Sequence, residues 1–82
     1  MKDLPLASCE EHVRALLRIP GCRVERKGAH VIVSREGSMF HASIPRHREV
    51  SRRLLANQLR LLGIDQAEYA AAFRKRRGPR PR

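Results

Sequence analysis

Hydrophobic residues recur at helical spacing near the start of the chain. Four apolar residues share one face of this segment: Cys9, Val13, Leu16 and Leu17. Ser8 and Glu11 form the Ser-x-x-Glu capping box that begins many helices. The pattern therefore predicts a helix over residues 9–18, ended by the Pro-Gly pair at 20–21. We expect His12, beside the apolar stripe, at the boundary of the core rather than in a metal site.

Between residues 22 and 44 apolar and polar residues alternate, as is typical of strands that bury one face. Lys27-Gly28 and Glu36-Gly37 fit two-residue hairpin turns, and Gly28 can take the positive φ that such a turn needs. These turns predict three antiparallel strands whose apolar residues share one face: Cys22, Val24, Ala29, Val31, Val33, Phe40, Ala42 and Ile44. The same register places Val31 opposite Val24 and Ala42. The other face is polar and open to solvent.

The last third of the chain predicts two helices. Ser51 is a suitable N-cap for a helix over residues 52–62, which Gly63 ends. A second capping box, formed by Asp65 and Glu68, predicts a helix over residues 66–75 that buries Tyr69, Ala70 and Phe73. The expected fold is α+β, with the order α-β-β-β-α and an added short C-terminal helix. A three-stranded antiparallel sheet carries the helices on one face. We expect a single domain over residues 1–75 and a basic, disordered tail over 76–82.

The composition narrows the possible partners. The formal charge of +10 favours a polyanion: RNA, DNA, an acidic protein or an anionic membrane. A chain of 82 residues has little room for a deep cavity, so we expect a surface site. No apolar run is long enough for a membrane span, and no secretory leader is visible, so we expect a cytoplasmic protein. The two cysteines and the nearby histidines lack the spacing of a zinc site.

His30 is the candidate catalytic residue, because it stands at the head of a strand on the polar face. The predicted register places Glu25 opposite His30 on one side and Ser43 opposite it on the other, with His41 on the diagonal. Cleavage of RNA through its 2′-hydroxyl needs a base, a proton donor and positive charge on the phosphorane. Histidine suits the first two tasks, and Lys27 or His41 is a possible donor or phosphate contact. Alternatively, His30 is an ordinary polar residue of a solvated face.

Arginines gather where the chain enters the second predicted helix. Side chains that could bind a phosphate backbone there are Arg46, Arg48, Arg52 and Arg53, and Arg23 and Lys27 add charge on the sheet. The alternative interpretation is a solvated helix face.

In its ordered set of features the sequence resembles the HicA-type toxins, a family of small bacterial endoribonucleases (mRNA interferases). The features are the amphipathic first helix, the Lys27-Gly28-Ala29-His30 turn, the strand ending Ile44-Pro45 and the helix ending in Leu61-Leu62-Gly63-Ile64. They span about residues 8–73, and Ala29 stands where the family pattern usually has serine. The resemblance implies a fold like that of double-stranded-RNA-binding domains and metal-independent RNA cleavage by His30. It also implies inhibition by a HicB-type antitoxin.

Two other functions compete with this interpretation. One is a non-catalytic module of the same fold that binds RNA or DNA through shape and phosphate contacts. The other is a structural or regulatory protein whose leucine-rich surface docks a partner. Substitution of His30 separates an enzyme from a binder, because a binder keeps its affinity.

Overall fold

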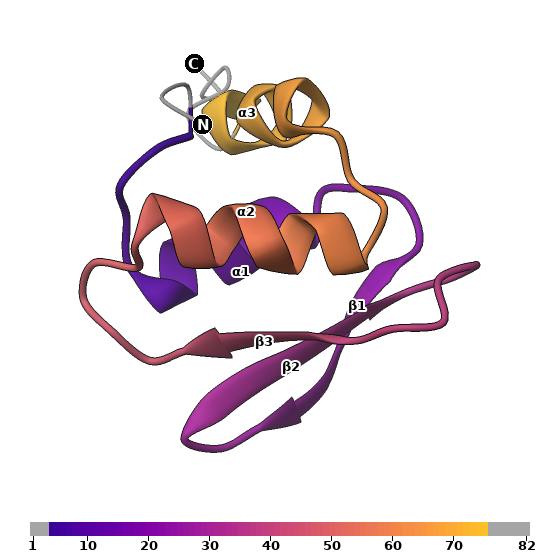
Figure 1. Ribbon diagram of the computed structural model, residues 1–82, viewed down its shortest axis with the longest axis horizontal. Coiled ribbons are helices and arrows are strands. Elements are labelled where there is room, and N and C mark those ends of the chain that lie inside the picture. Colours follow the sequence, from indigo (N-terminus) through magenta and orange to yellow (C-terminus); the bar gives the residue numbers. More distant parts are fainter. Residues whose placement is uncertain (1–3, 76–82) are drawn as a thin grey trace, which may run out of the picture.

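The computed structural model of the chain describes residues 4–75. Its elements follow the order α1 (Cys9–Leu16), β1 (Cys22–Lys27), β2 (His30–Arg35), β3 (Ala42–Pro45), α2 (Arg52–Leu61) and α3 (Gln66–Lys75). The strands form one antiparallel sheet in the order β1-β2-β3. Figure 1 shows α1 and α2 on one side of this sheet and α3 as a further layer beyond them. The predicted α+β fold is confirmed, whereas the predicted tail over 76–82 lies outside the described residues.

The helix starts follow the capping residues in the sequence. Ser8 Oγ accepts a hydrogen bond of 3.2 Å from the Glu11 N–H, and the Glu11 carboxylate accepts one of 3.0 Å from the Ser8 N–H. Ser51 Oγ likewise accepts from the Leu54 N–H at 3.1 Å. Each cap satisfies backbone donors that have no partner inside the helix. Beyond α2 the chain turns at Gly63, whose φ of +69° is a left-handed conformation that favours glycine.

The core lies between the sheet and its two covering helices. The sheet residues that are buried in it are Val31, Val33, Ala42 and Ile44. They pack with the apolar stripes of α1 and α2, including Leu16, Leu55 and Leu59. Two residues predicted for this face do not reach the core, because Ala29 lies in the turn before β2 and Phe40 lies in the loop before β3, where it is 58% exposed.

The pairing of β2 with β3 differs from the prediction by two residues. Val31 lies opposite Ile44 rather than Ala42, and Val33 lies opposite Ala42 rather than Phe40. The predicted turn at Glu36-Gly37 forms, but β3 begins only at Ala42. The Ser38 hydroxyl donates to the Leu61 carbonyl at 2.8 Å, which ties the intervening loop to the end of α2. Since side chains alternate with a period of two, the shift leaves the buried face of the sheet unchanged.

The pairing of β1 with β2 contains a bulge that the sequence did not predict. Val24 lies opposite Val33 rather than Val31, a shift of two residues from the prediction. Arg26 lies opposite Ile32, so Glu25 is an extra residue in β1. The bulge reverses the alternation after it, and Lys27 consequently lies opposite the buried Val31. Gly28 was predicted to have a positive φ, but it does not. The glycines with positive φ among the described residues are Gly21, Gly37 and Gly63.

α3 packs mainly against α1, through a buried aromatic cluster. His12 is completely buried there, so its predicted place at the boundary of the core is wrong. Its Nδ1 lies 2.6 Å from the Tyr69 hydroxyl, and its ring centre lies 5.7 Å from that of Phe73. Among residues 4–75, no helix is long and apolar enough to cross a membrane.

Candidate functional site

The face of the sheet opposite the helices carries His30. The residue begins β2, pairs with Pro45 of β3 and is exposed to solvent. It lines a hollow of about 290 Å³ with side chains from all three strands and the turn: Arg26, Ala29, Ile32 and Ser43. Arg26 reaches this face because of the bulge at Glu25. Ser43 lies opposite Ile32 rather than opposite His30 as predicted, because of the two-residue shift between β2 and β3.

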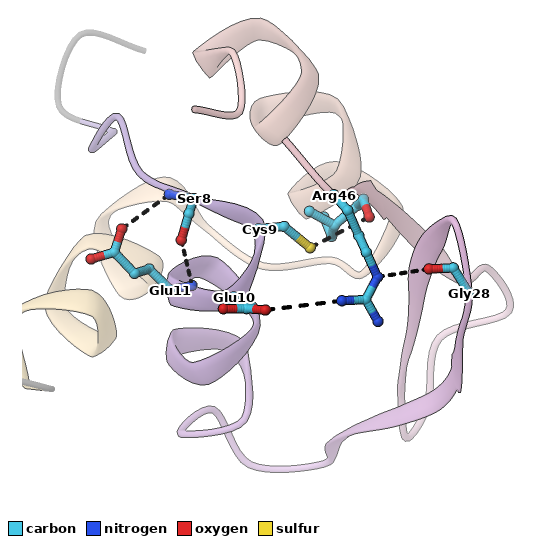
Figure 2. A network of polar contacts seen from close by, with 7 residues as sticks. Ser8, Cys9, Glu10, Glu11, Gly28 and Arg46 are labelled. Atoms are coloured by element: carbon cyan, nitrogen blue, oxygen red, sulfur yellow. Dashed lines mark hydrogen bonds and ion pairs between the residues drawn. The ribbon is translucent and has the colours of Figure 1, made fainter. Parts of the chain in front are cut away.

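The backbone of the turn before His30 is held by hydrogen bonds. The Gly28 N–H donates to the His30 carbonyl at 3.0 Å. Arg46 Nε donates to the Gly28 carbonyl at 2.7 Å, and Arg46 Nη1 lies 3.9 Å from Glu10 Oε2 on α1. Figure 2 shows the guanidinium of Arg46 between these two partners. Arg46, predicted to bind RNA, therefore connects the turn before His30 to α1.

The predicted register placed Glu25 beside His30, but in the structure Glu25 does not lie there. Its Oε2 accepts hydrogen bonds from Ser34 Oγ at 2.5 Å and from Arg23 Nε at 2.9 Å. These bonds, Ser34 first and Arg23 second, lower the pKa of Glu25, and the charge of His41 contributes to the same direction. Ser34 lies four residues beyond His30, about 13 Å along an extended strand. The bulge and the two-residue shift between β1 and β2 together move Glu25 to the opposite end of the open face.

A second hollow of about 440 Å³ surrounds Glu25. Its lining includes the side chains of Arg23, Ser34, Arg35, Glu36, Ser38 and His41. The predicted supporting residues are consequently divided. Ser43 lies with His30, and Glu25 and His41 lie together in the second hollow.

Lys27 belongs to neither hollow of the open face. It lines a depression on the helix side of the sheet together with α1 residues such as Val13 and Arg14. Its predicted place beside His30 is wrong, because one extra residue in β1 reverses the side on which it emerges.

The arginines near the start of α2 have different surroundings. Arg52 Nε donates to the Leu4 carbonyl at 2.6 Å, which holds the N-terminal segment against α2. Arg48 and Arg53 are exposed, and within residues 4–75 neither side chain takes part in a hydrogen bond or ion pair. Of this predicted set, these two remain available for a phosphate.

Elsewhere in residues 4–75 the titratable side chains do not form a metal-binding or nucleophilic site. Within the described part of the chain, no group of three His, Cys, Asp or Glu side chains is placed to hold a metal ion. The Cys9 thiol donates to the Ile44 carbonyl at 3.6 Å, and burial raises its pKa. A thiol with a raised pKa is a poor nucleophile, so packing accounts for Cys9.

Comparison of the chain with protein-family models, curated proteins and solved structures found no match. The resemblance to HicA-type toxins therefore stays a prediction from the order of the sequence features. The geometry of the open face is the remaining basis for a functional proposal.

Proposed function

We propose that this protein is a metal-independent endoribonuclease of the toxin type, an mRNA interferase, with His30 as its catalytic residue. The observation that carries the proposal is the exposed imidazole of His30 in one hollow with Arg26 and Ser43, on the sheet face opposite the helices. An imidazole can exchange a proton near neutral pH, and a guanidinium can bind a phosphate. The formal charge of +10 supports an RNA substrate, because it attracts polyanions.

In this reaction His30 accepts the proton of the ribose 2′-hydroxyl. The 2′-oxygen attacks phosphorus and the bond to the 5′-oxygen breaks, which leaves a 2′,3′-cyclic phosphate and a 5′-hydroxyl. Arg26 stabilises the negative charge on the phosphorane. The hollow is open to water, which protonates the leaving 5′-oxygen. Protein side chains thus supply the base and the positive charge.

The test is inducible expression of the wild type, His30→Ala and His47→Ala, with growth and bulk mRNA followed together. His47 is a matched control, because it is an exposed histidine in the loop before α2. We expect growth arrest and mRNA loss with the wild type and with His47→Ala only. The purified protein should cleave RNA in EDTA and leave a strand with a 2′-deoxyribose at the cleavage site intact. Intact mRNA for all three folded proteins would exclude the nuclease.

A second candidate function is a non-catalytic RNA-binding module. It is favoured by the surroundings of His30, because no hydrogen bond or ion pair within residues 4–75 orients its ring. Glu25, the carboxylate expected to do so, is bound by Arg23 and Ser34 instead. For such a module, His30→Ala leaves RNA affinity unchanged and the wild type shows no turnover.

The partner implied by the resemblance is a HicB-type antitoxin. The exposure of His30 supports this proposal, because a protein that covers the open face would block access of RNA to the imidazole. Co-expression of a small protein encoded beside this chain should restore growth. It should also form a complex with the purified wild type that no longer cleaves RNA.

A further inference from the structure

The hollow around Glu25 is balanced in charge. The guanidinium groups of Arg23 and Arg35 are offset by the carboxylates of Glu25 and Glu36. Arg35 is also committed elsewhere, with Nη2 3.5 Å from Glu68 Oε2 and Nη1 donating to the Gly63 carbonyl at 3.3 Å. A phosphate gains little in such surroundings. A neutral ligand with donors on one side and acceptors on the other fits them better.

Free hydrogen-bonding capacity remains at the centre of this hollow. Within residues 4–75 the Glu25 carboxylate accepts two hydrogen bonds, from Arg23 and Ser34, and both reach Oε2, so the lone pairs of Oε1 are available. Arg23 uses only its Nε, and its side chain is 77% exposed, so its two terminal nitrogens can donate to a ligand. The contacts with Ser34 and Arg23 also hold the carboxylate in place before a ligand binds.

We infer that this hollow is a guanine-binding subsite for single-stranded RNA. Guanine offers two adjacent donors, N1–H and N2–H₂, to a carboxylate, and two acceptors, O6 and N7, to a guanidinium. Uracil and cytosine each offer a single donor group on the corresponding edge, and adenine carries an amino donor at C6 where guanine has the O6 acceptor. The imidazole of His41 lines the same hollow and provides a flat surface on which the base stacks.

The subsite rests on the proposed function, because it takes its substrate class from it. Ser34 and His30 lie four residues apart on β2, about 13 Å along the strand. Stacked nucleotides rise about 3.4 Å each, so the guanine and the scissile phosphate are separated by no more than about four nucleotides. Ile32 lines the His30 hollow and lies between His30 and Ser34 along β2, where the intervening nucleotides pass. His30 thus performs the cleavage, and Glu25 selects where it occurs.

The experiment measures binding in the His30→Ala protein, so that its result does not depend on turnover. The probes are fluorescein-labelled RNA octamers of adenosine that carry one central G, A, C or U, at fixed salt. We expect the G octamer to bind about tenfold more tightly than the others, as one charge-assisted base contact provides. Addition of Glu25→Gln should reduce this preference to less than about twofold. Addition of Arg23→Gln should reduce it as well.

Two charge-matched controls separate recognition from general electrostatics. Glu49→Gln and Arg14→Gln change the same charges at exposed positions outside the hollow. They should keep the full preference for G, with small and uniform changes in affinity. Equal affinity of the unsubstituted protein for all four octamers would overturn the subsite, as would a Glu25→Gln effect that is the same for every octamer. A clear preference for G without cleavage by the wild type would instead overturn the nuclease and retain the subsite.

Discussion

Within the described residues His12 is the one charged or polar side chain that is fully buried. Its Nδ1 contacts the Tyr69 hydroxyl, but its Nε2 is buried without a hydrogen-bond partner. Burial lowers the pKa of His12 to about 4, against a smaller opposing effect of the Glu11 charge. A protonated imidazole has to bring its charge into this apolar cluster, and α3 is the element that closes the cluster over it. We therefore expect protonation of His12 to weaken the packing of α3 against α1.

The corresponding prediction concerns stability against pH. Between about pH 6.5 and pH 4 the unfolded chain binds the His12 proton and the folded protein does not, so the free energy of unfolding falls as the pH is lowered. We expect a loss of roughly 2 to 3 kcal/mol over this range, followed by a plateau for this group. Urea denaturation at intervals from pH 7 to pH 4 measures it.

The matched variants for this measurement are His12→Phe and His47→Ala. His12→Phe keeps a ring in the cluster and removes the titration, so its stability should vary little over the same range. His47→Ala should follow the wild type, because His47 is exposed. Glu25, whose pKa is lowered, changes stability only below its ordinary pKa of 4.5. An unchanged slope in His12→Phe would contradict the prediction.

At the scale of elements, the sequence was informative about faces and less so about pairing. Capping residues and apolar periodicity identified α1, α2 and α3, and alternation identified the buried side of β2 and β3. The partners across the sheet depended on turn length, and a shift of two residues satisfies the same alternation. The bulge at Glu25 has no clear signal, because any polar residue of an edge strand can be the extra one.

The same limit explains the candidate site. His30 was placed on the open face correctly. It begins the alternating pattern of β2, and the face on which its side chain lies follows from that alternation whatever the pairing with neighbouring strands. Its neighbours come from other strands, so Glu25, His41 and Lys27 were assigned to it incorrectly. Arg26 was missed for the complementary reason. Side chains alternate along a strand, so a regular β1 with Glu25 on the open face would place the next residue, Arg26, on the helix side. The bulge at Glu25 brings Arg26 to the open face instead.

The contact between Arg46 and Gly28 gives a prediction about how elements support the site. Arg46→Ala removes the 2.7 Å hydrogen bond to the Gly28 carbonyl and the contact with Glu10, and it should cost about 1 kcal/mol of folding free energy. RNA cleavage should fall further than stability, since the turn before His30 loses its link to α1. Urea denaturation and single-turnover cleavage measure the two effects.

Arg48→Ala is the control for Arg46→Ala. It removes the same charge at a position two residues away, where the side chain is exposed and makes no hydrogen bond or ion pair within residues 4–75. It should leave stability unchanged and lower RNA affinity slightly. Hydrogen exchange of the Gly28 amide should accelerate in Arg46→Ala and not in Arg48→Ala. Equal effects of the two substitutions would show that Arg46 acts through charge alone.

At the scale of the whole molecule, the two faces of the sheet have different tasks. One face is apolar and is covered by α1 and α2, which makes the domain stable. The other presents His30, Arg26 and the hollow around Glu25. Arg48 and Arg53 lie near the end of β3 and the start of α2 and are exposed. In the proposed function, base selection and cleavage belong to the open face of the sheet, and general attraction of RNA belongs to the charges around it.

The segment 76–82 provides a test of that division. It contains four arginines, Arg76, Arg77, Arg80 and Arg82, and no acidic residue. If they contact phosphates, replacing all four by glutamine lowers the slope of log affinity against log salt by up to about 3, at about 0.7 per phosphate contact for single strands. Affinity for every RNA should fall by the same factor at a given salt concentration, while the preference for a guanine octamer persists. Titrations between 50 and 200 mM salt, a range in which phosphate contacts strongly affect affinity, measure both quantities. A lost preference with an unchanged slope would place base recognition in the segment and remove it from the sheet.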